Sequence, residues 1–94
     1  MNKRFNFLRS PGDINSDLAN RVSQRRKEKK ITQKQLSQMS DVSLGSIKRF
    51  ERLGEISLSS LVKIAFVLGY EDDFDELFVK RGYRSIQEVI DEGK

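Results

Sequence analysis

Two short helical patterns, separated by only a few residues, occupy the middle of the chain and limit the folds open to it. The first is "TQKQLSQM", in which Thr32 and Gln35 have the spacing of a capping box at a helix start. The second follows "SDVS" and places Ile47 and Phe50 on one helix face, with Ser43 as the expected N-cap. Two helices joined by so short a turn must cross tightly.

A tight crossing requires particular residue types at the contact. The first helix needs a small side chain there, which Ser37 supplies, and the turn needs a residue that tolerates a positive φ, which Asp41 supplies. Apolar residues before, inside and after the turn fix the crossing angle, and Leu36, Val42 and Ile47 hold these positions. The segment therefore predicts a helix-turn-helix over about residues 32–52.

Further helices are expected on both sides of this motif. The repeat of Ile14, Leu18 and Val22 predicts a helix over 14–30, after a short arm that closes with a Pro-Gly pair. Downstream, "SLSSLVKIAFVLGY", "DFDELF" and "SIQEVIDE" each carry an apolar stripe at helical spacing. The patterns predict an all-α chain made of an arm at 1–13, a compact five-helix domain at 14–78 and an extension with a short helix at 79–94.

The stripes also predict which side chains face the core, and one member of a stripe is charged. Arg26 is the next residue after Val22 on the apolar face of the first helix. A buried charge is costly unless it is paired, so we expect a carboxylate partner for Arg26. The apolar residues expected inward are Leu36, Met39, Val42, Ile47, Phe50, Leu58, Leu61, Val62, Ala65, Leu68, Phe74, Leu77 and Phe78.

The composition excludes several classes of protein. The chain has no cysteine and no histidine, which removes disulfides, thiol nucleophiles, the commonest metal ligand and the usual general base. We expect no enzyme, no metal, no cofactor and no small-molecule ligand, and we interpret the acidic cluster of Asp72, Asp73, Asp75 and Glu76 as a solvated helix start. No apolar run approaches the roughly 20 residues that span a bilayer, and no secretory signal is present. We therefore expect a cytoplasmic protein.

The charge is divided unevenly along the chain. Residues 1–54 hold 13 Lys and Arg against 5 Asp and Glu, a balance of +8, whereas residues 55–94 hold 5 against 9, a balance of −4. A basic half beside an acidic half favours a face that binds a polyanion. An unevenly charged but merely solvated surface is the alternative.

The stretch "TQKQLSQMSDVSLGSIKRFERLG" resembles the DNA-binding domain of phage repressors and Cro proteins, also called the xenobiotic-response-element (XRE) helix-turn-helix regulators. The resemblance covers roughly residues 14–78 and includes the trailing "ISLSSLVKIAFVLGYEDDFDELF". Two departures are visible, because the family usually has alanine where this chain has Ser37 and glycine where it has Asp41. Both are mild. The resemblance implies a phage-repressor-like fold and double-stranded DNA as partner.

The resemblance also implies roles for individual residues. The carboxylate expected for Arg26 is Glu51, as a structural ion pair. The second helix of the motif would lie in the major groove, where Arg49 is the best candidate for a guanine contact. Lys48 could instead be solvated, and Leu44 could pack within the protein. The positions matching the family's DNA contacts are Gln33, Lys34, Ser43, Leu44, Gly45, Ser46, Lys48 and Arg49.

These implications lead to a sequence-specific transcriptional regulator, most simply a homodimeric repressor of its own operon that binds a palindromic operator. A weaker resemblance of "VSLGSIKRFERLGEISL" and "GYRSIQEVIDE" to regulators encoded beside HipA-type kinase toxins leaves an antitoxin role open. A phage or restriction–modification control protein is a third reading. Apolar residues at both ends of the chain could pair two copies or could cover the domain's own core: Phe5, Phe7, Tyr83, Ile86, Val89 and Ile90.

Overall fold

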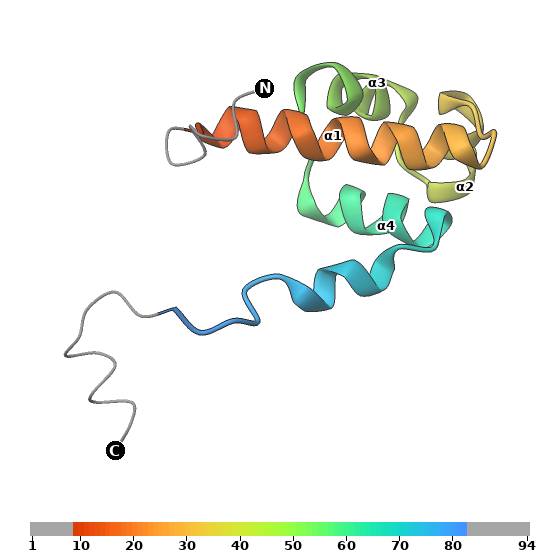
Figure 1. The fold of residues 1–94 in the computed structure, drawn as a ribbon. Coiled ribbons are helices and arrows are strands. Elements are labelled where there is room, and N and C mark those ends of the chain that lie inside the picture. Colours follow the sequence, from red (N-terminus) through yellow and green to blue (C-terminus); the bar gives the residue numbers. More distant parts are fainter. Residues whose placement is uncertain (1–8, 83–94) are drawn as a thin grey trace, which may run out of the picture.

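The computed structural model describes residues 9–82, and within them every regular element is helical (Figure 1). The elements are α1 (Pro11–Glu28), α2 (Gln33–Ser40), α3 (Leu44–Leu53), α4 (Leu58–Leu68) and the 3₁₀ helix η2 (Glu71–Glu76). The predicted all-α class is confirmed. Residues 1–8, with Phe5 and Phe7 of the expected arm, lie outside the described part, and so do residues 83–94, with the expected last helix.

The helix starts follow their cap residues. Thr32, Ser43 and Ser57 each accept a hydrogen bond from a backbone N–H of the first turn, as their positions predict. The start of α1 was predicted too late. Ser10 and Asp13 form a capping box, so the helix begins at Pro11, inside the range assigned to the arm.

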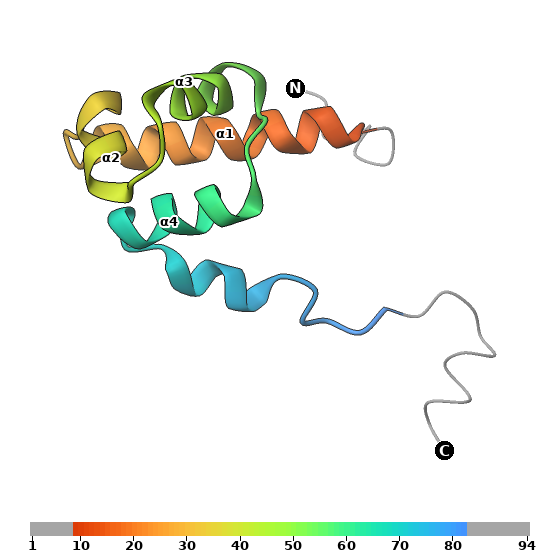
Figure 2. The ribbon, with the colours of Figure 1, turned by 180° about the vertical axis from the view of Figure 1, so that it is seen from behind.

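The arrangement centres on the α2–α3 pair. Both views show α3 along one side of the long α1 and α2 near the C-terminal end of α1 (Figures 1 and 2). α4 packs against α2 and carries η2 on its far end. The core is formed where these helices meet, by Leu36, Val42, Ile47, Ile64 and Leu68.

Five side chains predicted to lie on core-facing stripes are exposed instead, among them Ile14 of α1, which is 48% exposed. In α2, Leu36 and Ser40 share the inner side, and this turns Met39 to solvent with 59% of its surface exposed. In α4 the inner side is Ile64, Ala65 and Leu68, so that Ile64 was missed. The first residue of α4 extends past the core. Leu58 has 67% of its surface exposed, and Leu77 and Phe78, which follow η2, have 57% and 98% exposed.

Gly54 ends α3 with a left-handed φ of 77° and is buried against α1. A Cβ at this position would lie 3.0 Å from the backbone carbonyl carbon of Asn15, which is closer than most side chains pack. Gly69 ends α4 with a similar φ of 82°, but a Cβ there would meet nothing within 4 Å. Gly69 is therefore required only for its backbone conformation, whereas Gly54 is required also because α3 and α1 approach closely there.

We expect Gly69→Ala to lower the free energy of unfolding by about 1–2 kcal/mol, the cost of a left-handed conformation for a residue with a Cβ. Gly54→Ala should cost clearly more, because it adds a clash between α3 and α1 to the same strain. Urea unfolding followed by circular dichroism measures both. Equal losses in the two variants would mean that α1 yields without cost at Asn15.

Candidate nucleic-acid interface

Three hydrogen bonds that involve the hydroxyl groups of Ser37 and Ser40 hold the turn between α2 and α3. Asp41 takes the left-handed conformation expected of it, with φ 60° and ψ 30°. The Ser37 hydroxyl donates to the Val42 carbonyl at 2.6 Å, and the Ser40 hydroxyl donates to the Leu36 carbonyl at 2.6 Å. The Val42 N–H donates to the Ser40 oxygen at 3.3 Å. A serine at position 37 thus adds a bond that alanine could not make.

The α3 helix presents two different faces. Ile47 and Phe50 are almost completely buried in the core. The opposite face is exposed and carries Lys48, Arg49 and Arg52, while Glu51, the single acid of α3, is half-buried. All the charged residues that α3 carries on its outer face are therefore cations.

The N-terminal turn of α3 brings together four of the residues predicted to contact DNA. Ser43 caps the helix by accepting the Ser46 N–H at 3.0 Å, and its hydroxyl donates to the Ser46 oxygen at 2.8 Å. Leu44 and Ser46 are half-buried, and Gly45 is exposed. A Cβ at Gly45 would meet nothing within 4 Å, so the helix start offers open space for a ligand to approach.

The start of α2 lies beside α3 and contributes two further predicted residues. Lys34 is exposed, whereas Gln33 is half-buried. The side-chain amide of Gln33 donates one hydrogen bond to Glu51 at 3.0 Å, which fixes the position of the Gln33 side chain. This bond uses only one of the two amide hydrogens. The backbone N–H groups at a helix start also attract anions.

Arg26 and Glu51 form a two-pronged ion pair with side chains only 9% and 10% exposed. Arg26 Nε and Nη2 donate to the two carboxylate oxygens at 2.7 and 2.9 Å, and Nη1 donates to the Ile31 carbonyl at 2.7 Å. Ser23 and Gln33 donate to the same carboxylate at 3.2 and 3.0 Å. This cluster ties α1 and the start of α2 to α3.

The pKa of Glu51 reflects opposing influences. Burial acts to raise it, but the hydrogen bonds from Arg26, Gln33 and Ser23 and the charge of Arg26 together outweigh burial. The net result is a pKa lowered from its usual value of 4.5. Glu51 is therefore held ionised in the folded protein.

Arg49 has a partner that the sequence did not suggest. Its Nη2 lies 2.6 Å from Glu55 Oε1, and both side chains are more than half exposed. Glu55 follows directly after Gly54, where the chain reverses at the end of α3. The pairing depends on that reversal, because no helical spacing joins residues six apart.

Phe5, Phe7, Tyr83, Ile86, Val89 and Ile90 lie outside the described residues. Within residues 9–82, no three carboxylates come close enough together to hold a metal ion. None of the helices in that same part of the chain is long and apolar enough to cross a membrane.

Comparison with known proteins adds one match. A family model described as helix-turn-helix matches residues 22–74, from the middle of α1 into η2. Neither the curated proteins nor the solved structures contain a match to this chain. The matched segment includes the turn, the cationic face of α3 and the Arg26–Glu51 pair.

Proposed function

Because the chain belongs to the Cro/C1-type helix-turn-helix family of DNA-binding transcription regulators, we propose that it represses its own operon as a homodimer on a palindromic operator. The observation that carries this proposal is the outer face of α3, which is exposed and carries Lys48, Arg49 and Arg52 but no acidic residue of α3 itself. The acid beside it, Glu55, follows the helix and pairs with Arg49. The two α3 helices of a dimer would enter successive major grooves, about one helical turn apart.

We assign the contacts by geometry and residue type. Arg49 is the candidate for a two-pronged contact to a guanine, and Lys48 is placed to meet a base or a phosphate. Gln33 and Lys34 at the start of α2 would bind the backbone, with Gln33 already oriented by Glu51. The α3 start would approach the base edges most closely at its open helix turn, through Ser43, Leu44, Gly45 and Ser46.

Binding to the DNA just upstream of the chain's own gene tests this proposal. The full chain would be titrated by fluorescence anisotropy at about 0.15 M salt against that DNA and against a scrambled duplex of equal length. A preference of about a thousandfold or more fits a specific operator. Equal, weak and steeply salt-dependent binding to both would reject autoregulation, since phosphate attraction alone behaves in that way.

Glu55→Gln tests whether the Glu55 carboxylate tunes the reading face. The substitution removes a negative charge beside the DNA and releases Arg49. We expect binding to the scrambled duplex to strengthen by about two- to tenfold and the preference for the operator to fall. The anisotropy titration above measures both.

Glu28→Gln is the matched control, because Glu28 is also an exposed glutamate paired with an arginine, Arg25, at 2.9 Å. It changes the net charge equally but lies at the end of α1. If both variants change DNA binding to the same extent, Glu55 acts only through the overall charge.

A further inference from the structure

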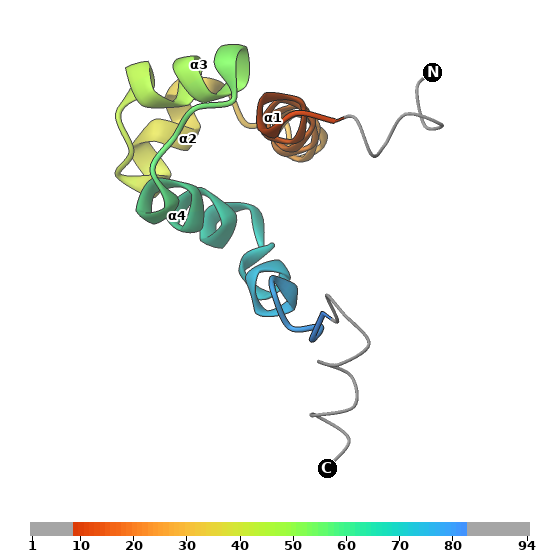
Figure 3. The ribbon, with the colours of Figure 1, turned by 90° about the vertical axis from the view of Figure 1, so that its left-hand side faces the viewer.

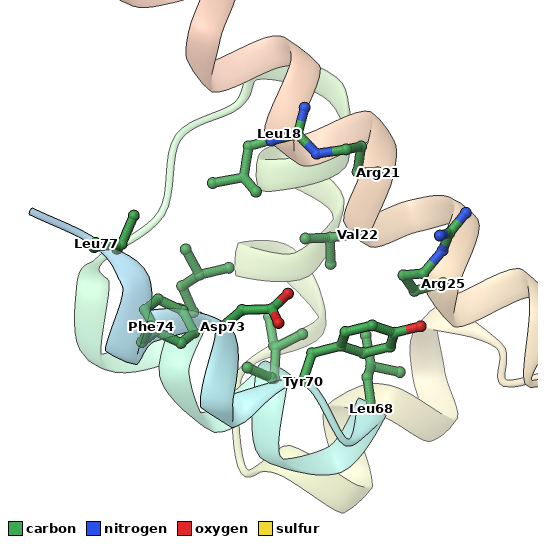
Figure 4. Close-up of a pocket in the computed structure, with 12 residues that line it drawn as sticks. Leu18, Arg21, Val22, Arg25, Leu68, Tyr70, Asp73, Phe74 and Leu77 are labelled. Atoms are coloured by element: carbon green, nitrogen blue, oxygen red, sulfur yellow. The ribbon is translucent and has the colours of Figure 1, made fainter. Parts of the chain in front are cut away.

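An apolar groove of about 310 Å³ runs between α1 and the α4–η2 unit. Figure 4 shows Leu18 and Val22 on the α1 side, facing Leu68 and Phe74 across the opening. The groove exists because α1 packs along α3 while α4 packs against α2 and η2. The wall of α1 that faces α4 therefore has no helix laid directly upon it in the described part of the chain.

The rim of the groove is charged, and the end of the groove at Leu77 is exposed to solvent. Arg21 and Arg25 stand one helical turn apart on α1, and Asp73 lies on the opposite wall (Figure 4). Leu77 lines the groove although 57% of its surface is exposed, and Tyr70, toward the other end of the groove, is 38% exposed (Figure 4). A domain of this size buries a smaller fraction of its surface on folding than a larger domain does, so its stability is marginal and an apolar groove left open to water lowers that stability.

We propose that residues 83–94 of the same chain occupy this groove, with Ile86, Val89 and Ile90 against its apolar floor. The described chain reaches Gly82 only five residues after Leu77, which itself lines the groove. Figure 3 shows α1, η2 and the last described residues on one side of the molecule, with α2 and α3 on the other. Residues 83–86 add up to roughly 14 Å of extended chain beyond Gly82.

The chemistry of the segment suits the groove. Its three aliphatic residues have the spacing of one helix face, which matches an apolar floor. Residues 85–92 hold three acidic residues and no basic one, while the α1 rim carries Arg21 and Arg25, the second of which is also paired with Glu28. Those acids also make DNA an unsuitable partner for the segment, and the groove lies on the side of the molecule away from α3.

The segment of the same chain is favoured over that of a second copy by its tether. A short covalent connection gives the segment an effective concentration in the millimolar range at its own groove. A second copy would have to exceed that concentration to compete. The assignment takes Ile86, Val89 and Ile90 for the core of one domain. In the proposed dimer, the arm with Phe5 and Phe7 is then the remaining candidate for pairing.

The substitution Ile90→Asp in the full chain tests the docking, with Gln87→Asp as a control that adds the same charge off the apolar face. We expect Ile90→Asp to lower the midpoint of thermal unfolding by about 5 °C or more and Gln87→Asp to leave it almost unchanged. The drop should be the same over a hundredfold range of protein concentration. Equal midpoints for the two variants would overturn the proposal. So would a drop that grows on dilution together with a loss of dimer in sedimentation, which would place the segment between copies.

A second pair of variants identifies the groove as the docking site. Leu77→Asp alters the groove, whereas Phe66→Asp alters α4 at a residue 63% exposed and outside the groove lining. We expect the drops caused by Leu77→Asp and Ile90→Asp to overlap when the two are combined, and those of Phe66→Asp and Ile90→Asp to add. Additive drops in both combinations would place the segment elsewhere. Neither measurement uses DNA, so the result stands apart from the proposed repressor function.

Discussion

Replacing Arg26 by methionine is expected to lower the free energy of unfolding by about 3–5 kcal/mol, which is a large part of the stability of a domain this small. The guanidinium supplies two of the four hydrogen bonds that the Glu51 carboxylate accepts, with both side chains nearly buried. Without it, a buried carboxylate keeps only Gln33 and Ser23 as donors. Urea unfolding of the variant beside the parent chain measures the loss.

The double variant Arg26→Met with Glu51→Leu separates the two possible reasons for that loss. If the cost comes from stranding a buried charge, removing both partners should restore most of the stability, because apolar side chains of similar size can replace a buried pair. A double variant as unstable as Arg26→Met would show instead that the interhelical bonds themselves hold α1 to α3.

The pH dependence of the same variant follows from the lowered pKa of Glu51. A carboxyl whose pKa is lower in the folded than in the unfolded chain stabilises the fold fully above the unfolded value of 4.5. That contribution is lost as the pH falls through the folded pKa. The stability difference between the parent chain and Arg26→Met should therefore be largest above pH 4.5 and narrow in more acidic solution.

The Arg26–Glu51 cluster also shows which contacts could be predicted from the sequence and which could not. The position of Arg26 on an apolar stripe required an acid, and the family resemblance pointed to Glu51. The contributions of Ser23 and the Ile31 carbonyl had no signal of their own, because a hydroxyl one turn earlier and a backbone oxygen carry no pattern. Contacts that depend on how two helices are rotated against each other cannot be read from the spacing within either one.

Rotation also explains the residues that were placed on the wrong side. In α2, Met39 was expected to face inward with Leu36, but Ser40 takes that place. The tight crossing instead favours the smaller serine, whose hydroxyl is satisfied by the Leu36 carbonyl. Local signals performed better, since Ser43 caps α3 and Asp41 adopts a positive φ, as their residue types predict. The residues proposed to contact DNA stay predictions.

Arg49→Ala is expected to weaken binding to the operator by about 5- to 150-fold, the equivalent of the 1–3 kcal/mol that a two-pronged guanine contact contributes to discrimination. The side chain is more than half exposed and bound only by an exposed ion pair to Glu55 within the described residues, so the fold should be unaffected. Binding to a scrambled duplex should fall much less. Anisotropy titrations on both duplexes, with circular dichroism for the fold, measure these effects.

Arg49→Lys decides what kind of contact is lost. Lysine keeps the charge but not the planar fork, so a base contact should lose most of its discrimination while a phosphate contact should lose little. Arg52→Ala is the control for charge, since Arg52 is exposed on the same helix nearer its C-terminal end. We expect it to weaken binding to both duplexes alike, as removal of a phosphate contact does. If Arg49→Lys keeps the full operator preference, Arg49 binds the backbone, and the discrimination must come from the α3 start between Ser43 and Ser46.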